Sequence, residues 1–376
     1  MKKIKILHCL ETVGSGGVEQ LKLLKARQLD GARYEQALIC TKAVGALPAQ
    51  FELAGCPVHE IGVFRGIFDR VRYMRALAIV REYRPDIIHG AVYEGVAVAS
   101  LVGRMAGVPV IIGEETSDPV NRRWTGSVLY RCLAGLTHQM VAVSPAVKRY
   151  LVDDIKLPLE RVALINNGVF DPGFSGDAVR AEIRRRLGIQ EGDFVIGSCG
   201  RLLDSHKRFS DLIQAFSIIR RQVPSAKLLI VGEGPDENAL QALAVQLGVG
   251  DGVLFVGYQA ETRPYYDVMD IFCLASAHEA FGLVLVEAML ADLAVVATRV
   301  GGIPSVVEEG ETGYLVDPLA PADLASRLLE LIENSPLRTL MGQRGRERAA
   351  SKFGADRYVR EFDLLYQRLV SRRICP

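Results

Sequence analysis

Residues 271–290 read IFCLASAHEAFGLVLVEAML. The apolar run Ile271–Ala275 predicts a buried strand, and the apolar residues around Glu287 predict a helix. The turn at 281–283 lies between the strand and the helix and opens the helix. A buried strand followed by a loop and a helix is the repeating unit of a parallel α/β sheet, so this stretch indicates the fold class.

The same stretch carries two carboxylates. Glu279 lies in the predicted loop and Glu287 lies in the predicted helix, eight positions later. Between them, Phe281, Gly282 and Leu283 begin a helix whose first N–H groups have no intrahelical partner and carry about half a positive charge. Such a helix start suits a phosphate, and the flanking carboxylates can accept hydrogen bonds from sugar hydroxyls. This combination indicates a sugar-nucleotide site.

Similar strand–helix units run through the whole chain in two series. The strand-like runs are 4–10, 36–40, 87–89, 110–112 and 139–143, then 194–199, 227–231, 253–256, 271–275 and 294–298. Helical periodicity fills the intervals, for example at 21–29, 71–82, 210–222 and 239–247. The turn-rich segment 166–176 separates the two series and predicts a linker.

These patterns predict an α/β protein with two Rossmann-like, doubly wound parallel-sheet domains facing a cleft. We expect an N-terminal domain at 1–168 and a C-terminal domain at 177–352. A Tyr/Leu/Arg-rich amphipathic helix follows from about 353.

Composition excludes several other classes. The chain has 376 residues, 49% hydrophobic and 24% charged, which is typical of globular chains. Its seven cysteines show no CxxC pair or His/Cys cluster, which predicts reduced thiols, a cytoplasmic location and no structural zinc. No apolar run is long enough to predict a transmembrane helix, and Ile4–Leu10 is interpreted as a first strand and not as a signal peptide.

Charge is distributed unevenly along the chain. Residues 1–170 hold 22 Lys and Arg against 16 Asp and Glu, and the remainder holds 23 against 28. Much of the basic excess falls at Arg65, Arg70, Arg72, Arg75, Arg81 and Arg84. A basic half favours an anionic partner such as a lipid head group or a phosphate-linked acceptor, and a solvated helix face explains the same charges equally well.

Basic and glycine-rich turns follow several of the predicted strands. After the strand 194–199, Gly200 and Arg201 precede Lys207, and two cations at that strand end suit a diphosphate. The turns Gly14–Glu19, Gly232–Pro235 and Gly301–Pro304 indicate either a tight turn or a close approach of a ligand to the backbone. For the second of these, the sequence by itself favours the turn.

A histidine follows another strand. His89 ends the run 87–89, where a side chain faces a cleft more often than the core, so general acid–base chemistry or acceptor contact is one interpretation. A satisfied polar group at the strand end is the other. Neither a DxD motif nor a ligand-spaced His/Asp cluster supports metal catalysis, and Ser144 lacks the GxSxG elbow of a hydrolase.

Together these motifs resemble the family-4 retaining glycosyltransferases of the GT-B fold. The resemblance covers nearly the whole chain and is densest at 197–317. The matching motifs, in the family's order, are Gly16-Gly17-Val18-Glu19, Gly200-Arg201…Lys207, Glu279-x7-Glu287 and Gly301-Gly302-Ile303-Pro304.

The resemblance implies a role for each of these positions. Arg201 and Lys207 would neutralise the departing diphosphate, and the backbone at Phe281, Gly282 and Leu283 would hold its distal phosphate. Glu279 would hold sugar hydroxyls and Glu287 the ribose. The remaining positions would line the donor site from the two domains: Gly16, Gly17, Gly200 and Gly232.

The resemblance also implies the reaction and its setting. The C-terminal domain would bind a UDP- or GDP-linked sugar, and the N-terminal domain, with a crossing helix at about 353–376, would bind a glycan or lipid-linked acceptor. Transfer of a hexosyl or N-acetylhexosaminyl group would retain the anomeric configuration without a metal or a cofactor. We expect a cytoplasmic location, with peripheral contact with anionic membrane through the basic N-terminal domain, and no nucleic-acid partner.

Some positions depart from the family pattern. Many relatives carry a histidine after the strand 110–112, where this chain has Gly113-Glu114-Glu115-Thr116. Whether Glu114, Glu115 or Thr116 takes its place is open. Two other functions compete with transfer to a glycan or lipid. One is a sugar-nucleotide epimerase or sugar-phosphate synthase acting on a small soluble acceptor, and the other is a non-catalytic partner subunit.

Overall fold

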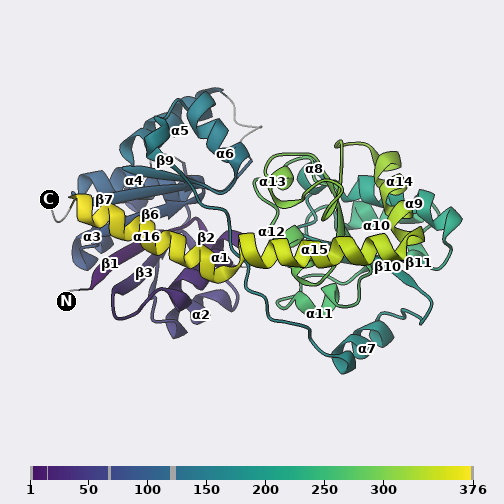
Figure 1. Cartoon of the computed structure of the whole chain (residues 1–376). Coiled ribbons are helices and arrows are strands. Elements are labelled where there is room, and N and C mark those ends of the chain that lie inside the picture. The colour runs from purple at the N-terminus through teal and green to yellow at the C-terminus, as the bar shows by residue number, and fades with distance from the viewer. Residues whose placement is uncertain (1–2, 15, 67–68, 119–123, 374–376) are drawn as a thin grey trace. The chain divides into compact units, whose positions relative to one another are not determined.

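The computed structural model describes residues 3–14, 16–66, 69–118 and 124–373 (Figure 1). The chain divides into two compact units. Unit 1 comprises Met1–Gly168 together with Ala355–Pro376, and unit 2 comprises Val169–Gly354. That the two units face each other across a cleft stays a prediction.

Unit 1 is built on a seven-stranded sheet in the order β5-β3-β1-β6-β7-β8-β9, with every strand pairing parallel. Its strands are β1 (Ile4–Cys9), β3 (Tyr34–Cys40), β5 (Val58–Glu60), β6 (Ile87–Ala91), β7 (Val110–Glu115), β8 (Gln139–Ala142) and β9 (Val162–Leu164). A small parallel pair, β2 (Thr12–Val13) and β4 (Lys42–Ala43), stands apart from it.

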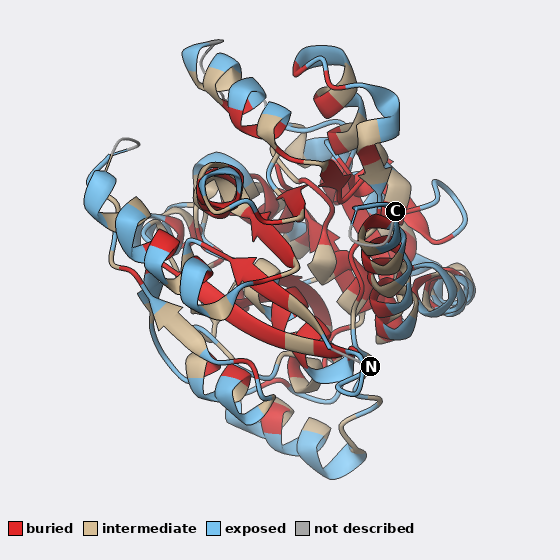
Figure 2. Cartoon of the chain, turned by 90° about the vertical axis from the view of Figure 1, so that its left-hand side faces the viewer, coloured by how far each residue is buried: buried red, intermediate tan, exposed pale blue. Residues whose placement is uncertain are grey.

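Helices cover this sheet. They are α1 (Gly17–Gln28), α2 (Leu47–Leu53), α3 (Arg70–Tyr83), α4 (Val92–Met105), α5 (Trp124–Leu136), α6 (Pro145–Arg149) and α16 (Ala355–Arg373), with a π-helical turn at Tyr150–Asp154 and a 3-10 turn at Leu159–Arg161. Figure 2 shows buried strands surrounded by helices with exposed outer faces. One core cluster of this unit lies under α3 and α4, and another lies under α1 and α2.

Unit 2 repeats the plan with a six-stranded parallel sheet in the order β12-β11-β10-β13-β14-β15. Its strands are β10 (Phe194–Cys199), β11 (Ala226–Val231), β12 (Val253–Phe255), β13 (Ile271–Leu274), β14 (Ala294–Thr298) and β15 (Gly313–Val316). Its helices are α7 (Asp177–Arg186), α8 (Asp204–Lys207), α9 (Phe209–Gln222), α10 (Glu237–Gln246), a 3-10 turn at Gly250–Gly252, α11 (Arg263–Tyr266), α12 (Leu283–Leu290), α13 (Ile303–Val306), α14 (Pro321–Glu333) and α15 (Ser335–Phe353).

The prediction of an α/β protein with parallel sheets in two domains is therefore confirmed. Every strand-like run becomes a strand, because buried parallel strands consist of nearly continuous apolar residues. The sequence did not reveal the edge strands β5, β9 and β15, which have three or four residues each.

The strand order places a topological switch point in each sheet. In unit 2 the order reverses between β10 and β13, which are hydrogen-bonded neighbours. In unit 1 the corresponding neighbours are β1 and β6. Ligands of open α/β sheets bind outside the carboxyl ends of the strands at such points. The loops after β10 and β13 are thus the first place to look for a site in unit 2.

Among the described residues, none of the helices is both long and apolar enough to cross a bilayer. The six cysteines in that part of the chain are free thiols.

Candidate functional site

The two loops at the switch point of unit 2 are joined through their backbones. The carbonyl of His206, at the end of α8, accepts hydrogen bonds from the N–H groups of Ala277 at 2.8 Å and His278 at 3.3 Å. The His206 and His278 rings pack edge to face, with centroids 5.5 Å apart. These contacts fix the loop after β10 against the loop after β13.

The joined loops bring together two of the predicted site residues. The Lys207 ammonium donates a hydrogen bond to the Glu279 carboxylate, and their side chains are 22% and 15% exposed. A half-buried ion pair that still reaches solvent can exchange partners when an anion arrives. Arg201 lies earlier in the same loop with an exposed side chain, so it is available to an anion at the same strand end.

Helix α12 begins beside this ion pair, as the sequence predicts. Gly282 caps it in the left-handed region, with φ 98°, which favours glycine. The backbone at 281–283 therefore presents the first N–H groups of an eight-residue helix. These groups and the helix dipole favour an anion at this position.

Glu287 lies one turn further along α12 and has a partner that the sequence did not indicate. The Tyr266 hydroxyl donates a hydrogen bond to the Glu287 carboxylate at 2.8 Å, and Thr262 adds a second bond. Burial raises the pKa of Glu287, and these two bonds partly oppose that rise.

The other glycine turns of unit 2 pack against the protein's own backbone. A Cβ at Gly232 would lie 2.0 Å from the Gly200 carbonyl oxygen, and one at Gly302 would lie 2.1 Å from the Ala280 carbonyl oxygen. Only glycine fits at such a distance. The structure thus supplies a packing reason for Gly232, where the sequence favoured a turn.

In unit 1, Gly16 caps α1 and Gly17 is its first residue, a few residues after the end of β2 at Val13. A Cβ at Gly16 would lie 2.3 Å from the Glu19 carboxylate, so the glycine lets that carboxylate fold back over the helix start. Burial raises the pKa of Glu19. The described part of the predicted turn therefore lies at the start of α1, with the Glu19 carboxylate beside it, and Ser15 lies outside the described residues.

His89 does not lie open at its strand end, so the expectation that its side chain faces a cleft is wrong. Its side chain is 0% exposed, with Nε2 3.1 Å from the Glu114 carboxylate and Nδ1 2.8 Å from the Tyr366 hydroxyl of α16. The terminal helix, distant in sequence, covers the strand end. Burial, followed by the charges of Lys22 and Lys25, lowers the pKa of His89 well below 6.5. A neutral, enclosed ring is the satisfied polar group that the sequence also allowed.

Glu114 belongs to the same buried network. The Lys22 ammonium lies 2.5 Å and the Lys25 ammonium 3.6 Å from its carboxylate, and all three side chains are at most 1% exposed. Burial would raise the pKa of Glu114, but Lys22 and Lys25 outweigh it and hold that pKa well below its usual value. Glu114 is thus enclosed with these lysines. Glu115 accepts two hydrogen bonds from Ser117, and Thr116 stays half-buried.

Two family models match the chain. The model described as Glycosyl transferases group 1 matches residues 179–348, and the model described as Glycosyl transferase 4-like domain matches residues 16–168. The chain belongs to the family-4 glycosyltransferases of the GT-B fold.

Two individual relatives match less than half of this chain. The glycosyltransferase is 34% identical over 185 residues to the N-acetyl-alpha-D-glucosaminyl L-malate synthase of Bacillus anthracis, covering 49% of this chain and 48% of that one. It is 32% identical over 162 residues to the lipopolysaccharide core biosynthesis glycosyltransferase LpsE of Rhizobium meliloti, covering 43% and 46%. The chain spans about half the length of these relatives.

A solved structure matches nearly the whole fold. The Anabaena protein Alr3699/HepE, in complex with UDP and glucose, superposes with a TM-score of 0.87 at 22% identity, covering 97% of this chain and 99% of that one. Because the sequence identity is only 22%, this likeness shows that the two proteins share a fold and no more.

Within the described residues, no group of three or more His, Cys, Asp or Glu side chains could hold a metal ion.

The Tyr266 bond predicts how nucleotide binding depends on pH. Tyr266→Phe removes a donor from Glu287, which raises the pKa of that carboxyl further. We expect the dissociation constant for UDP or GDP, whichever binds, to rise roughly tenfold near neutral pH, as for a lost bond to a charged group. The loss of nucleotide affinity on acidification should begin at a higher pH, because the Glu287 carboxylate takes up its proton at a higher pH. Calorimetric titration from pH 5 to 8 measures both effects.

Tyr265→Phe is the matched control. Tyr265 belongs to the same short helix as Tyr266, but its hydroxyl accepts a hydrogen bond from Arg186 and does not contact Glu287. This variant should leave unchanged the pH at which affinity is lost. Equal pH profiles for the two variants would show that Tyr266 does not act through Glu287.

The buried histidine predicts acid sensitivity. In the folded glycosyltransferase His89 takes up a proton only well below pH 6.5, whereas in the unfolded chain it does so near 6.5. The unfolded state therefore binds more protons in this range, and stability falls as pH decreases, by about 1.4 kcal/mol per pH unit for each such group. Burial also lowers the pKa of His8 and the pKa of His138, so these two residues add to the slope.

We expect His89→Gln to reduce the slope of unfolding free energy between pH 6 and 5 by about 1.4 kcal/mol per pH unit, measured by urea titration of the full chain. His59→Gln, outside the network, serves as the control and should keep the slope of the original protein. An unchanged slope in His89→Gln would contradict a neutral His89.

Proposed function

We propose that this glycosyltransferase retains anomeric configuration, needs no metal or cofactor, and moves a hexosyl or N-acetylhexosaminyl group from a UDP- or GDP-linked sugar. The acceptor is a glycan or a lipid-linked sugar in surface polysaccharide or glycolipid biosynthesis, at the inner face of the cell membrane. The observation that carries the proposal is the contact between Lys207 and Glu279 beside the start of α12. The relative named for lipopolysaccharide core biosynthesis supports the choice of acceptor class.

Each residue at the switch point has a role in donor binding. The distal phosphate binds the N–H groups at the start of α12, and Arg201 and Lys207 neutralise the diphosphate. When the phosphate draws Lys207 away, the Glu279 carboxylate becomes free to hold the hydroxyls of the donor sugar. Glu287, oriented by Tyr266, holds the ribose. His89 has no part in the chemistry because it is enclosed.

The reaction forms a bond between the acceptor oxygen and the anomeric carbon while the bond from that carbon to the distal phosphate oxygen breaks. On the same face of the sugar, the departing phosphate oxygen takes the acceptor's proton. Negative charge grows on the diphosphate as it leaves. Stabilisation of that charge by Arg201, Lys207 and the start of α12 is then the main contribution to rate.

A second candidate has its own support. The relative named as an N-acetyl-alpha-D-glucosaminyl L-malate synthase acts, by its name, on a small anionic acceptor. The same donor half would serve such a reaction. Release of free nucleotide with small sugar phosphates or malate, and none with lipid-linked acceptors, would favour this candidate.

A donor screen tests the proposal. Purified protein is mixed with common UDP- and GDP-sugars, and both thermal stabilisation and release of nucleotide are measured. We expect one donor to stabilise the protein and to be consumed, and NMR of the product to show the donor's anomeric configuration. Absence of binding and turnover across the panel would sink the proposal, and an inverted product would exclude the retaining route.

Glu279→Gln sharpens the test. It keeps the side-chain volume but removes the charge that pairs with Lys207, and it replaces one of the two acceptor oxygens with an NH2 donor, which weakens the grip on sugar hydroxyls. We expect kcat/KM to fall roughly 100-fold, or about 3 kcal/mol, with protein stability changed little. Glu191→Gln changes an exposed glutamate of unit 2 outside the switch point and should leave turnover intact. Full activity in Glu279→Gln would remove Glu279 from the site.

A further inference from the structure

Helix α3 (Arg70–Tyr83) has two unlike faces. Its inner face, with Ala76, Leu77 and Val80, is buried in a core cluster of unit 1, and Tyr73 packs against that cluster. These positions follow the three- and four-residue spacing of a helix seated on a sheet. The inner face therefore fixes which side of α3 points to solvent.

The outer face carries an apolar stripe where a surface helix ordinarily carries polar residues. Val71, Met74 and Ala78 are exposed and follow i, i+3, i+7 spacing, and Val71 and Met74 are each 55% exposed. Val63, in the segment leading to the helix, is 58% exposed. A shallow hollow of about 460 Å³ lies over the helix, lined by Arg70, Val71, Met74, Arg75 and Ala78. A continuous stripe of this kind marks an interaction surface.

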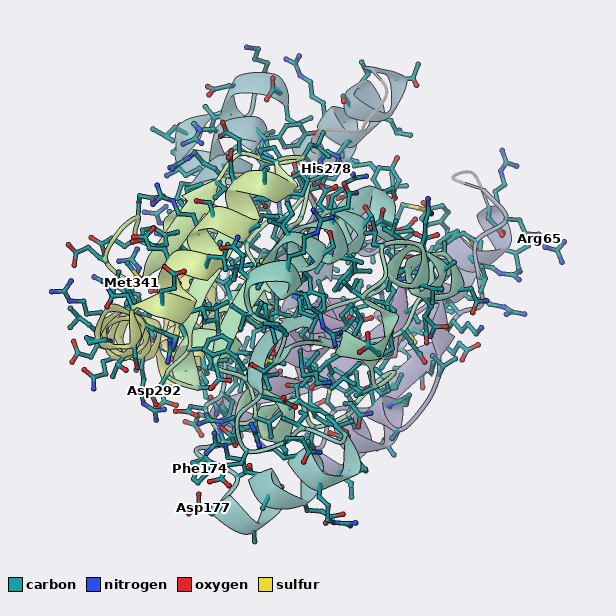
Figure 3. The ribbon with its side chains drawn as sticks, turned by 90° about the vertical axis from the view of Figure 1, so that its right-hand side faces the viewer. Arg65, Phe174, Asp177, His278, Asp292 and Met341 are labelled. Carbon is teal, nitrogen blue, oxygen red and sulfur yellow. The ribbon has the colours of Figure 1, made fainter. Side chains whose placement is uncertain are left out.

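Arginines border the stripe on both sides. At about 100° per residue, Arg70 and Arg81 lie along one edge and Arg75 along the other. Residues 61–81 contain five arginines and one acid, Asp69. Figure 3 shows the Arg65 side chain, from the same segment, pointing away from the body of the protein.

Few of these charges are neutralised locally. Asp69 caps α3 and lies 3.9 Å from Arg72, and Arg75 donates a hydrogen bond to the Ile61 carbonyl. Within the described residues, no carboxylate lies within ion-pair distance of Arg65, Arg70 or Arg81. Glu82 is the one acid on the outer face of α3, at its far end.

The pairing of an apolar stripe with an arginine border discriminates between explanations. A solvated helix face explains the arginines, but it gives no reason for Val71 and Met74 to be exposed between them. A protein partner or a second copy of the chain would have to supply a dense set of acids around an apolar centre. A bilayer with anionic head groups supplies both at once, since the stripe enters the boundary of the acyl chains and the arginines meet the phosphates.

We propose that the outer face of α3, with Val63 and Arg65, is a docking surface for an anionic lipid bilayer. The surface deepens the proposed function, because it would hold the glycosyltransferase where a lipid-linked acceptor is found. Association is peripheral and electrostatic in part, so it weakens as salt screens the arginines.

The test is flotation of the full-length protein with vesicles of equal parts phosphatidylglycerol and phosphatidylcholine, and with vesicles of phosphatidylcholine alone. We expect binding to the anionic vesicles at low salt, a marked loss at high salt, and weak binding to the neutral vesicles. Met74→Ser should lower the partition coefficient about tenfold. The combination of Arg70→Gln, Arg75→Gln and Arg81→Gln should lower it roughly 100-fold, at about fivefold for each charge.

Leu53→Ser, on helix α2, is the control for an exposed apolar residue, at 89% exposure, and Arg221→Gln, on α9, is the control for an exposed arginine. Both should bind vesicles as the original protein does. Binding to neither vesicle type, or equal binding by the α3 variants, would overturn the proposal. So would a dimer in size-exclusion chromatography with light scattering that Met74→Ser dissociates, because the face would then be a self-contact.

Donor stabilisation is measured on the same samples. Vesicle binding without any donor binding would end the proposed function and leave this inference intact. Donor binding that is the same in all variants, together with no vesicle binding, would overturn this inference and leave the proposed function intact.

Discussion

The candidate site in unit 2 depends on one constraint, the meeting of two loops at the switch point of the second sheet. Because β10 and β13 are neighbours, the segments that follow them leave the sheet at the same edge. The His206 carbonyl then fixes the second loop by its backbone. As a result Lys207 contacts Glu279 beside the start of α12. A cation, an anion and unpaired helix N–H groups within one small region suit a phosphorylated sugar better than any single motif would.

Unit 1 uses buried charge for a different purpose. Its polar network joins α1, β6 and β7 to the terminal helix α16. Lys25 lies 3.7 Å from the centroid of the Phe362 ring, and His89 shares a hydrogen bond with Tyr366. Removing one partner from such a cluster leaves a buried charge without compensation and is strongly destabilising. The network therefore specifies where the end of the chain docks, and it encloses residues that would otherwise be available to a ligand.

The sequence predicted the strands well and the contacts of their ends poorly. Apolar runs such as Phe194–Cys199 identify buried parallel strands because both faces of the sheet are covered. The opening of α12 was also predictable, since Gly282 is required by its backbone conformation. By contrast, His89 was wrongly placed, because a strand-end rule cannot account for a helix that returns from the far end of the chain. Tyr266 could not be found, since nothing near it in sequence indicates that it contacts Glu287.

The proposed function requires a nucleoside diphosphate to bind the second unit at the start of α12. A crystal structure of the protein with the nucleoside diphosphate of its donor tests it most directly. We expect the distal phosphate to lie within hydrogen-bond distance of the Gly282 and Leu283 N–H groups, and Lys207 to have moved from Glu279 to the phosphate. A diphosphate bound elsewhere, with the contact between Lys207 and Glu279 intact, would contradict it.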